Sequence, residues 1–176
     1  MKTNVIFLLA FSFCIVSTGC KQQQQPAIEE QPAAVEVDLI NDEFTEAQQE
    51  IEQTMSDIMQ SIKDGDIDKL LSFHAYGPKF TEFINGAPRH GSKGNEEIER
   101  STFEAVTEVI KMDANDMKIA VYGDVANVTF HSDFQLKFGE DLAVVNNQIS
   151  LLFVKNREGA WKIVHEHHSP LRMGEE

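Results

Sequence analysis

Apolar residues in the first half of the folded region recur every three or four positions, as they do on one face of a helix. This stripe predicts a first helix that begins near Asn41 or Asp42 and ends at Gly65. A second, short helix follows directly, with Asp66 as its cap. The inward positions of the two helices are Phe44, Ile51, Met55, Ile58 and Ile62, then Ile67, Leu70 and Leu71.

A third helix is predicted after an irregular stretch over residues 75–94. Asn95 or a neighbour is its expected cap, because these residue types favour helix starts. His74 is expected to end the second helix against its free carbonyl groups. The inward positions of the third helix are Ile98, Thr102, Val106, Val109 and Ile110.

The period of the apolar pattern then changes to two, which is typical of half-buried strands. Residues 117–122 alternate, and Gly123 and Asp124 turn the chain into a long strand whose even-numbered positions from 128 to 138 are mostly apolar. Two more strands cover residues 148–154 and 161–170. Helices followed by a run of antiparallel strands predict the α+β fold class.

The N-terminus reads as a targeting segment. An apolar run over residues 5–16 is too short to span a bilayer, and it leads to Ser17-Thr18-Gly19-Cys20. These residues resemble the bacterial lipoprotein box, in which the Cys receives the lipid, although Ser17 stands where that box usually has an aliphatic residue. An ordinary signal peptide cleaved nearby is the alternative.

This pattern predicts three parts: a lipoprotein signal peptide over residues 1–19, a disordered tether over residues 20–40 and one domain over residues 41–173. The tether is rich in Gln and Pro and poor in large apolar residues. We expect a lipoprotein anchored in the bacterial cell envelope through lipid on Cys20, facing the periplasm or the cell exterior.

The chain is acidic, with 15 Lys and Arg against 29 Asp and Glu and a net charge of −14. Such a charge repels phosphate backbones and anionic lipid, so we expect no nucleic-acid partner and no membrane contact except through the lipid. The two cysteines, Cys14 and Cys20, both lie in the N-terminal segment. The domain therefore has no disulfide, thiol nucleophile or Cys metal site.

The order of helices and strands, the GDID of residues 65–68 and the WKIVHEHHS of residues 161–169 together resemble the SnoaL-like superfamily. The terminal segment is similar to the end of the calmodulin-dependent kinase association domain. The resemblance covers residues 41–170 and implies the cone fold shared with ketosteroid isomerase and nuclear transport factor. In that fold three helices pack on a strongly curved antiparallel sheet around an internal pocket. The superfamily includes enzymes, binding proteins and assembly modules, so the fold leaves function open.

The last strand supplies the first candidate site. Regular alternation puts His165 and His167 on the side of Trp161 and Ile163, so these histidines should point into the cone. With Tyr76 and Trp161 they form the expected ligand pocket. The alternative is that the imidazoles only satisfy buried polar neighbours.

Glu82 supplies the second candidate. By its spacing to Pro88, Arg89 and Gly91 it matches the proton-shuttling aspartate of ketosteroid isomerases, so the resemblance implies a general base. The isomerase tyrosine and oxyanion-hole aspartate, however, would fall near Ile58 and Leu151, so steroid isomerisation is not expected. Glu82 is otherwise a solvated acid or a partner of Arg89.

His165 and His167, two residues apart on a strand, could converge on a metal ion with Glu82 as a third ligand. Paired histidines on a strand without a clear third ligand are more often hydrogen-bonded, so we expect neither a metal nor a cofactor.

The sequence favours a pocket that binds a small, partly apolar molecule, with no assigned reaction. One alternative is an isomerase, cyclase or hydratase with Glu82 and His165 as acid and base; another is a non-catalytic dimerising module. We also expect a homodimer through the outer face of the sheet, with Leu152, Val154 and Val164 near its centre, because these residues form an apolar patch.

Overall fold

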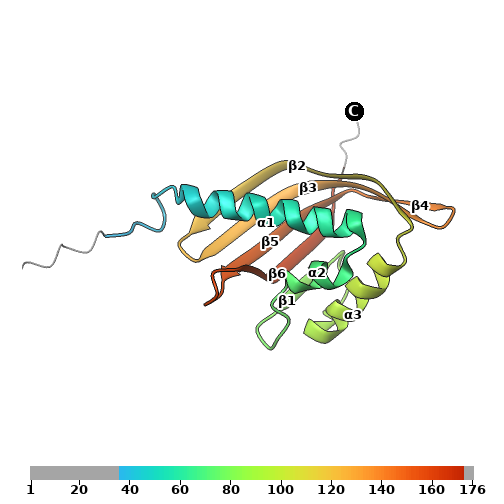
Figure 1. The fold of residues 1–176 in the computed structure, drawn as a ribbon, viewed down its shortest axis with the longest axis horizontal. Coiled ribbons are helices and arrows are strands. Elements are labelled where there is room, and N and C mark those ends of the chain that lie inside the picture. Colours follow the sequence, from blue (N-terminus) through green and yellow to red (C-terminus); the bar gives the residue numbers. More distant parts are fainter. Residues whose placement is uncertain (1–35, 173–176) are drawn as a thin grey trace, which may run out of the picture. The chain divides into compact units, whose positions relative to one another are not determined.

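The computed structural model describes residues 36–172, in which three helices lie on one side of a curved sheet (Figure 1). The predicted signal peptide and Cys20 lie outside the described residues. No helix within residues 36–172 is long and apolar enough to cross a membrane. The elements in chain order are α1 (Thr45–Asp64), α2 (Ile67–Ser72), β1 (Thr81–Ile84), α3 (Gly91–Glu104), β2 (Glu108–Tyr122), β3 (Val125–Phe138), β4 (Asp141–Val145), β5 (Asn147–Lys155) and β6 (Trp161–Pro170).

The sheet has the strand order β1-β6-β5-β3-β2, and β4 pairs with β3 beyond the start of β5. All neighbours are antiparallel except β1 and β6, which run parallel. Irregularities in the register of β2 against β3 fall between Val109 and Lys111 and between Asn115 and Lys118. Such bulges bend a sheet. The predicted α+β class with a curved sheet is confirmed.

The end of α1 and the beginning of α2 lie where the sequence predicted them. Gly65 follows α1 in the left-handed conformation with φ 69°, and its N–H donates to the carbonyl of Ile62. Asp66 caps α2 by accepting from the N–H of Lys69. The predicted cap of α1 is wrong, because the helix begins at Thr45 and Phe44 occupies the cap position without a side-chain bond.

The third helix differs most from its prediction. It begins at Gly91 and ends at Glu104, so Val109 and Ile110 belong to β2 instead. Asn95 is fully buried inside the helix, whereas Ile98 is 39% exposed. The inner face of α3 is partly polar because its side chains bond to groups on neighbouring elements, and apolar periodicity cannot detect such a face.

Two short strands were not predicted. β1 lies within the stretch expected to be irregular, and its four residues pair with the edge of β6. β4 has five residues, of which Leu142 and Val144 are each 53% exposed. Both strands are too short to show a reliable period.

A bulge in β6 changes which side chains face the helices. Leu152 on β5 pairs with His165, but the next residue, Phe153, pairs with Ile163, so Val164 is an extra residue. Side chains alternate strictly along a strand, and one extra residue therefore exchanges the two faces beyond it.

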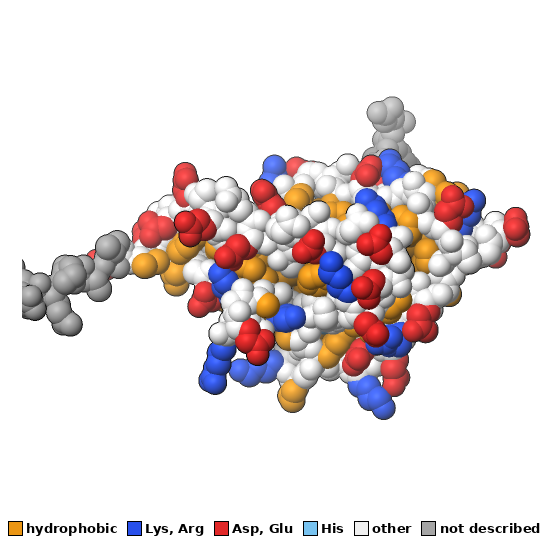
Figure 2. Space-filling model, in the orientation of Figure 1, with side chains coloured by type: hydrophobic (Ala, Val, Ile, Leu, Met, Phe, Trp, Pro, Cys, Tyr) orange, Lys and Arg blue, Asp and Glu red, His pale blue; other side chains and the backbone are white. Residues whose placement is uncertain are grey.

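The apolar core lies between α1, α2 and the concave face of the sheet. Its central side chains, fully buried, include Ile51 of α1, Val128 of β3 and Phe153 of β5. On the face shown in Figure 2, acidic and basic side chains are interspersed, with apolar side chains visible between them.

Candidate functional site

A cavity of about 90 Å³ lies between the helices and the concave face of the sheet. Most of its wall is apolar, and its polar groups come from four side chains only: His74, Glu99, Glu166 and His168. The apolar lining residues are Met55, Ile58, Met59, Ile62, Leu70, Phe103, Met112, Phe130, Phe134, Ile149, Leu151 and Ile163. An apolar cavity with a few converging polar groups is the usual form of a small-molecule site.

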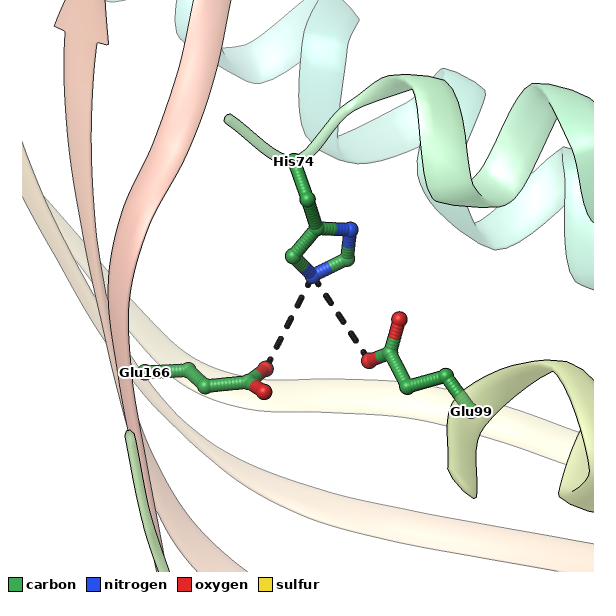
Figure 3. Close-up of side chains that lie close together, drawn as sticks. All are labelled: His74, Glu99 and Glu166. Atoms are coloured by element: carbon green, nitrogen blue, oxygen red, sulfur yellow. Dashed lines mark ion pairs between the residues drawn. The ribbon is translucent and has the colours of Figure 1, made fainter. Parts of the chain in front are cut away.

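His74, Glu99 and Glu166 converge at the polar wall of this cavity (Figure 3). The Nε2 atom of His74 lies 3.6 Å from Oε1 of Glu99 and 3.8 Å from Oε2 of Glu166. The side chains of His74 and Glu166 are 3% exposed and that of Glu99 is 17% exposed. We call these three residues the His-Glu-Glu cluster.

Each member of the cluster comes from a different part of the fold. His74 follows α2, where the chain pairs with β6: Ala75 donates to the carbonyl of Ile163, and Ile163 donates to the carbonyl of Phe73, both at 2.8 Å. Glu99 lies on α3, one turn after the buried Asn95. Glu166 points inward because the bulge at Val164 turns it to the side of the helices.

Both carboxylates use one oxygen for an additional donor. The Tyr76 hydroxyl donates to Oε2 of Glu99 at 2.8 Å, and Nδ2 of Asn95 donates to Oε1 of Glu166 at 2.6 Å. The ring of Tyr76 also stacks on that of His74, with centroids 4.9 Å apart. The remaining oxygen of each carboxylate therefore faces the imidazole of His74.

His168 extends the cluster along β6. Its Nε2 atom lies 3.4 Å from Oε2 of Glu166, and the side chain is 26% exposed. Two residues apart on a regular part of the strand, Glu166 and His168 share a face. Four metal-type or acid-base side chains thus surround the polar end of the cavity.

The environment shifts the pKa values of the two carboxyl groups in opposite directions. Burial raises the pKa of Glu99, which the nearby imidazole of His74 opposes and the charge of Glu166 reinforces. Burial would also raise the pKa of Glu166, but His168 and His74 outweigh it and hold this pKa well below its usual range. Glu166 is therefore the ionised carboxylate and Glu99 the more readily protonated one.

The two side chains that face this pair also favour their protonated forms. Burial alone would lower the pKa of His74, but the carboxylates of Glu166 and Glu99 outweigh it and raise the pKa. Burial and the neighbouring Glu99 raise the pKa of Tyr76, so its hydroxyl remains a donor. A carboxylate held in its ionised form, a carboxyl group that keeps its proton more readily and an imidazole, all close together, are the groups that acid-base chemistry requires.

The predicted positions of His165 and His167 are wrong. Beyond the bulge at Val164 both rings lie on the outer side of the sheet, where each packs edge-on against Phe83. His165 also bonds through Nδ1 to the hydroxyl of Thr81 at 2.8 Å, and His167 is exposed. The prediction assumed regular alternation along the strand. The bulge breaks this alternation, and the pattern of apolar residues does not reveal it.

Glu82 is buried, but it holds the start of a helix. Its Oε1 accepts from the backbone N–H groups of His90 and Gly91, where α3 begins, and such groups have no partner within the helix. Arg89 is not its partner, because the guanidinium lies 4.3 Å from the centroid of the Phe83 ring. Glu82 pairs in register with Glu166, on the neighbouring strand, but does not line the cavity.

The other two predicted pocket residues take supporting positions. Tyr76 bonds to Glu99 behind the cavity wall, as described above. Trp161 is buried, donates from Nε1 to Glu50 at 2.8 Å, and borders a separate surface hollow beside α1. Neither side chain lines the cavity.

Three comparisons place this structure among known proteins. Residues 51–173 match the model of the SnoaL-like domain family. No curated protein matches the sequence at a significant level.

Similar solved structures include an NTF2-like family protein from Streptomyces avermitilis, provisionally described as a dehydratase, with 17% identity, coverage of 73% of this chain and 99% of that chain, and a TM-score of 0.64. An NTF2-like superfamily protein from Salmonella enterica has 20% identity, coverage of 74% and 95%, and a TM-score of 0.62. A protein from Exiguobacterium sibiricum, provisionally described as a calcium/calmodulin-dependent kinase II association domain, has 12% identity, coverage of 73% and 95%, and a TM-score of 0.60.

At these identities the structures establish the fold alone, and the family match covers most of the chain. Both agree with the resemblance drawn from the GDID and WKIVHEHHS segments, which is confirmed. The chain belongs to the SnoaL-like domain family.

Proposed function

We propose that this protein is a bacterial envelope lipoprotein, anchored through Cys20, whose SnoaL-like domain binds a small, partly apolar molecule. The observation that carries the proposal is the cavity between helices and sheet, with an apolar wall and the His-Glu-Glu cluster at one end. The apolar wall favours the hydrocarbon part of a ligand. The cluster offers both donors and acceptors to its polar group.

The cavity volume restricts the size of this ligand. About 90 Å³ holds only a small molecule, because an apolar cavity of about 150 Å³ accommodates benzene. Three methionines line the wall, Met55 and Met59 from α1 and Met112 from β2. Methionine side chains are flexible and adapt to irregular shapes, so the wall can widen around a somewhat larger ligand.

Filling the cavity tests the proposal. Small molecules extracted from the purified full chain are identified by mass spectrometry, and the extraction is repeated with Met59→Trp. The larger side chain occupies the cavity, so the molecule bound by the natural chain should be lost. Ile98→Trp, on the exposed side of α3, is the matched control and should retain it. Recovery of the same molecule from Met59→Trp would contradict binding in the cavity.

A second function, acid-base catalysis, is favoured by one specific observation. Glu99 and Glu166 have pKa values shifted in opposite directions around the shared imidazole of His74. Pairs of titratable groups whose pKa values are shifted apart in this way identify acids and bases in many enzymes. The roles assigned from the sequence to Glu82 and His165 therefore pass to Glu99 and His74, and the reaction class remains proton transfer on a small substrate with a carbonyl or hydroxyl group.

A simple probe distinguishes catalysis from binding. Cyclopentanone exchanges the hydrogens next to its carbonyl for deuterium in D₂O, and proton NMR follows this exchange. An acid-base site should accelerate the exchange, and Glu99→Gln should remove most of the acceleration while the probe still binds. Exchange equal to that of buffer alone would leave the protein a binder.

A further inference from the structure

The polar end of the cavity gathers four donor atoms of the kind that bind transition metals. They are Nε2 of His74, Oε1 of Glu99, Oε2 of Glu166 and Nε2 of His168. One donor atom from each of the first three residues lies within 4.8 Å of the others. The donors come from α3, β6 and the segment after α2, so the fold itself brings them together.

The separations in this group exceed those of direct hydrogen bonds. His74 Nε2 is 3.6 Å from Glu99 and 3.8 Å from Glu166, and His168 Nε2 is 3.4 Å from Glu166. An N–H···O bond measures about 2.9 Å. A tetrahedral ion with ligands at about 2.0–2.1 Å keeps neighbouring ligands about 3.3 Å apart. The distances between the donor atoms are therefore closer to those between two ligands of one ion than to those of direct hydrogen bonds.

The hydrogen bonds that hold the two carboxylates also match those made by metal ligands. Ligating carboxylates are commonly held by a hydrogen bond to the oxygen that does not bind the metal. Tyr76 holds Oε2 of Glu99 and Asn95 holds Oε1 of Glu166, which leaves the opposite oxygens directed at His74. These contacts orient both carboxylates before any ion binds.

Two ring nitrogens of these side chains lack a partner within the described residues, Nδ1 of His74 and Nε2 of His168, and the second lies at the candidate ion site. Nε2 of His168 is buried and makes no hydrogen bond within the part of the chain that the structure describes, although it faces Oε2 of Glu166. A buried polar atom without a partner is costly. An ion between the two side chains would satisfy it.

Charge gives a further reason for a cation. Two carboxylates are brought into a largely apolar wall, and in the described chain neither contacts Lys or Arg. Buried charges in proteins are paired or coordinate metals. A divalent cation would neutralise both carboxylates.

We propose that His74, Glu99 and Glu166 bind one divalent transition-metal ion, with Zn²⁺ the ion best suited to imidazole and carboxylate ligands, and that His168, which lies beside Glu166, is the nearest candidate for a fourth ligand. Imidazole and carboxylate ligands suit zinc, and the apolar cavity lies beside the ion. A ligand in the cavity could then place its polar group on the metal. The inference deepens the proposed function, and it rests on that function only for this last step.

The test uses the full chain, purified in mild detergent and freed of metal with a chelator. Zn²⁺ is added and binding is followed by calorimetry, while elemental analysis after desalting counts the bound ions. Cobalt(II) serves as a second probe, because a tetrahedral Co²⁺ site absorbs strongly in the visible range. We expect one ion per chain and a tetrahedral Co²⁺ spectrum.

Glu99→Gln and His74→Gln should each weaken Zn²⁺ binding at least about tenfold. The matched control replaces two histidines outside the cluster, His165→Gln with His167→Gln, and should leave binding unchanged. No saturable binding by the natural chain would overturn the proposal, as would binding that survives both cluster variants and disappears in the control.

X-ray anomalous scattering at the zinc edge from crystals of the natural chain locates the ion without any variant, so a variant that fails to fold does not prevent the test. An ion found only at the surface would overturn the proposal. Binding of cyclopentanone is measured separately, with and without Zn²⁺, and its absence in both states would contradict the proposed function alone.

Discussion

Ile163 and Glu166 lie on the same face of β6 although three positions separate them, an odd spacing that a regular strand would place on opposite faces. The extra residue is Val164, where the register of β6 against β5 shifts. Ile163 is 2% exposed and Glu166 is 3% exposed. The bulge therefore brings a carboxylate to the cavity and turns His165 and His167 away from it.

Replacement of side chains on the two faces of β6 tests this arrangement. Glu166→Ala should lower the free energy of unfolding by about 3 kcal/mol, because it leaves His74 and Asn95 without their buried partner. His167→Ala on the outer face should change it by less than about 0.5 kcal/mol. Both values come from chemical denaturation of the metal-free chain. Equal effects of the two substitutions would contradict the assignment of faces.

Much of the fold follows from periodicity, but the site does not. The stripe of α1, the Gly65 end and the even-numbered face of β3 depend on many residues that agree, so their prediction succeeded. The face of β6 beyond Ile163 depends on one inserted residue, and its apolar pattern contains no sign of that insertion.

The positions of Glu99 and His74 were missed for different reasons. Glu99 lies on a polar inner face of α3, which apolar periodicity assigned to Ile98 instead. Its spacing of four residues from Asn95 and from Phe103 marks this face, yet nothing in the sequence shows which partners would satisfy it. His74 reaches the cluster through pairing of its backbone with β6, a long-range contact that local sequence does not encode.

The stability of the metal-free chain should depend on pH through the cluster. The pKa values of His74 and Glu99 are raised above 6.5 and 4.5, so the folded state binds their protons more tightly than the unfolded state does. Their contribution to stability is present at low pH and is lost as pH rises through the folded pKa values. Glu166, whose pKa is lowered, loses its contribution only as pH falls below 4.5.

Thermal unfolding in chelator between about pH 5 and about pH 8 measures this dependence. The natural chain should lose stability relative to Glu99→Gln as pH rises, because the variant lacks one titrating group and removes a charge beside His74. Tyr76, which also faces the cluster, stays protonated throughout this range. Parallel curves for the two proteins would show that the buried groups do not interact as described.

Lipid attachment is tested by a single substitution. Cys20→Ala should remove the acceptor and move the protein from the membrane fraction to the soluble fraction, or leave it unprocessed. The measurement is fractionation of cells followed by mass spectrometry of the N-terminus. Cys14→Ala, within the predicted signal segment, is the matched control and should not change the distribution. Recovery of the natural protein only in the soluble fraction would rule out the anchor.

A homodimer through the outer face of the sheet also remains a prediction. Leu152, Val154 and Val164 are all partly exposed, and the apolar ring of Phe83, 46% exposed, lies on the same sheet. Leu152→Glu should convert the dimer to a monomer in analytical ultracentrifugation, because it places a charge in an apolar contact. Ile98→Glu, on α3, should leave the dimer intact. A natural chain that sediments as a monomer at about 100 μM would contradict the dimer itself.

The most direct test of the central claim observes the cavity while a small molecule enters it. Met55, Met59 and Met112 line the cavity, whereas Met117 packs against the core without lining it. Carbon-13 labelling of the methionine methyl groups gives each of them a separate NMR signal, and cyclopentanone is the probe. If the cavity is the binding site, saturable shifts and probe-to-methyl Overhauser effects should occur at Met55, Met59 and Met112 and be weakest at Met117. If the signals of these three methyl groups do not move when cyclopentanone is added, or if their shifts do not saturate, the cavity is not the binding site.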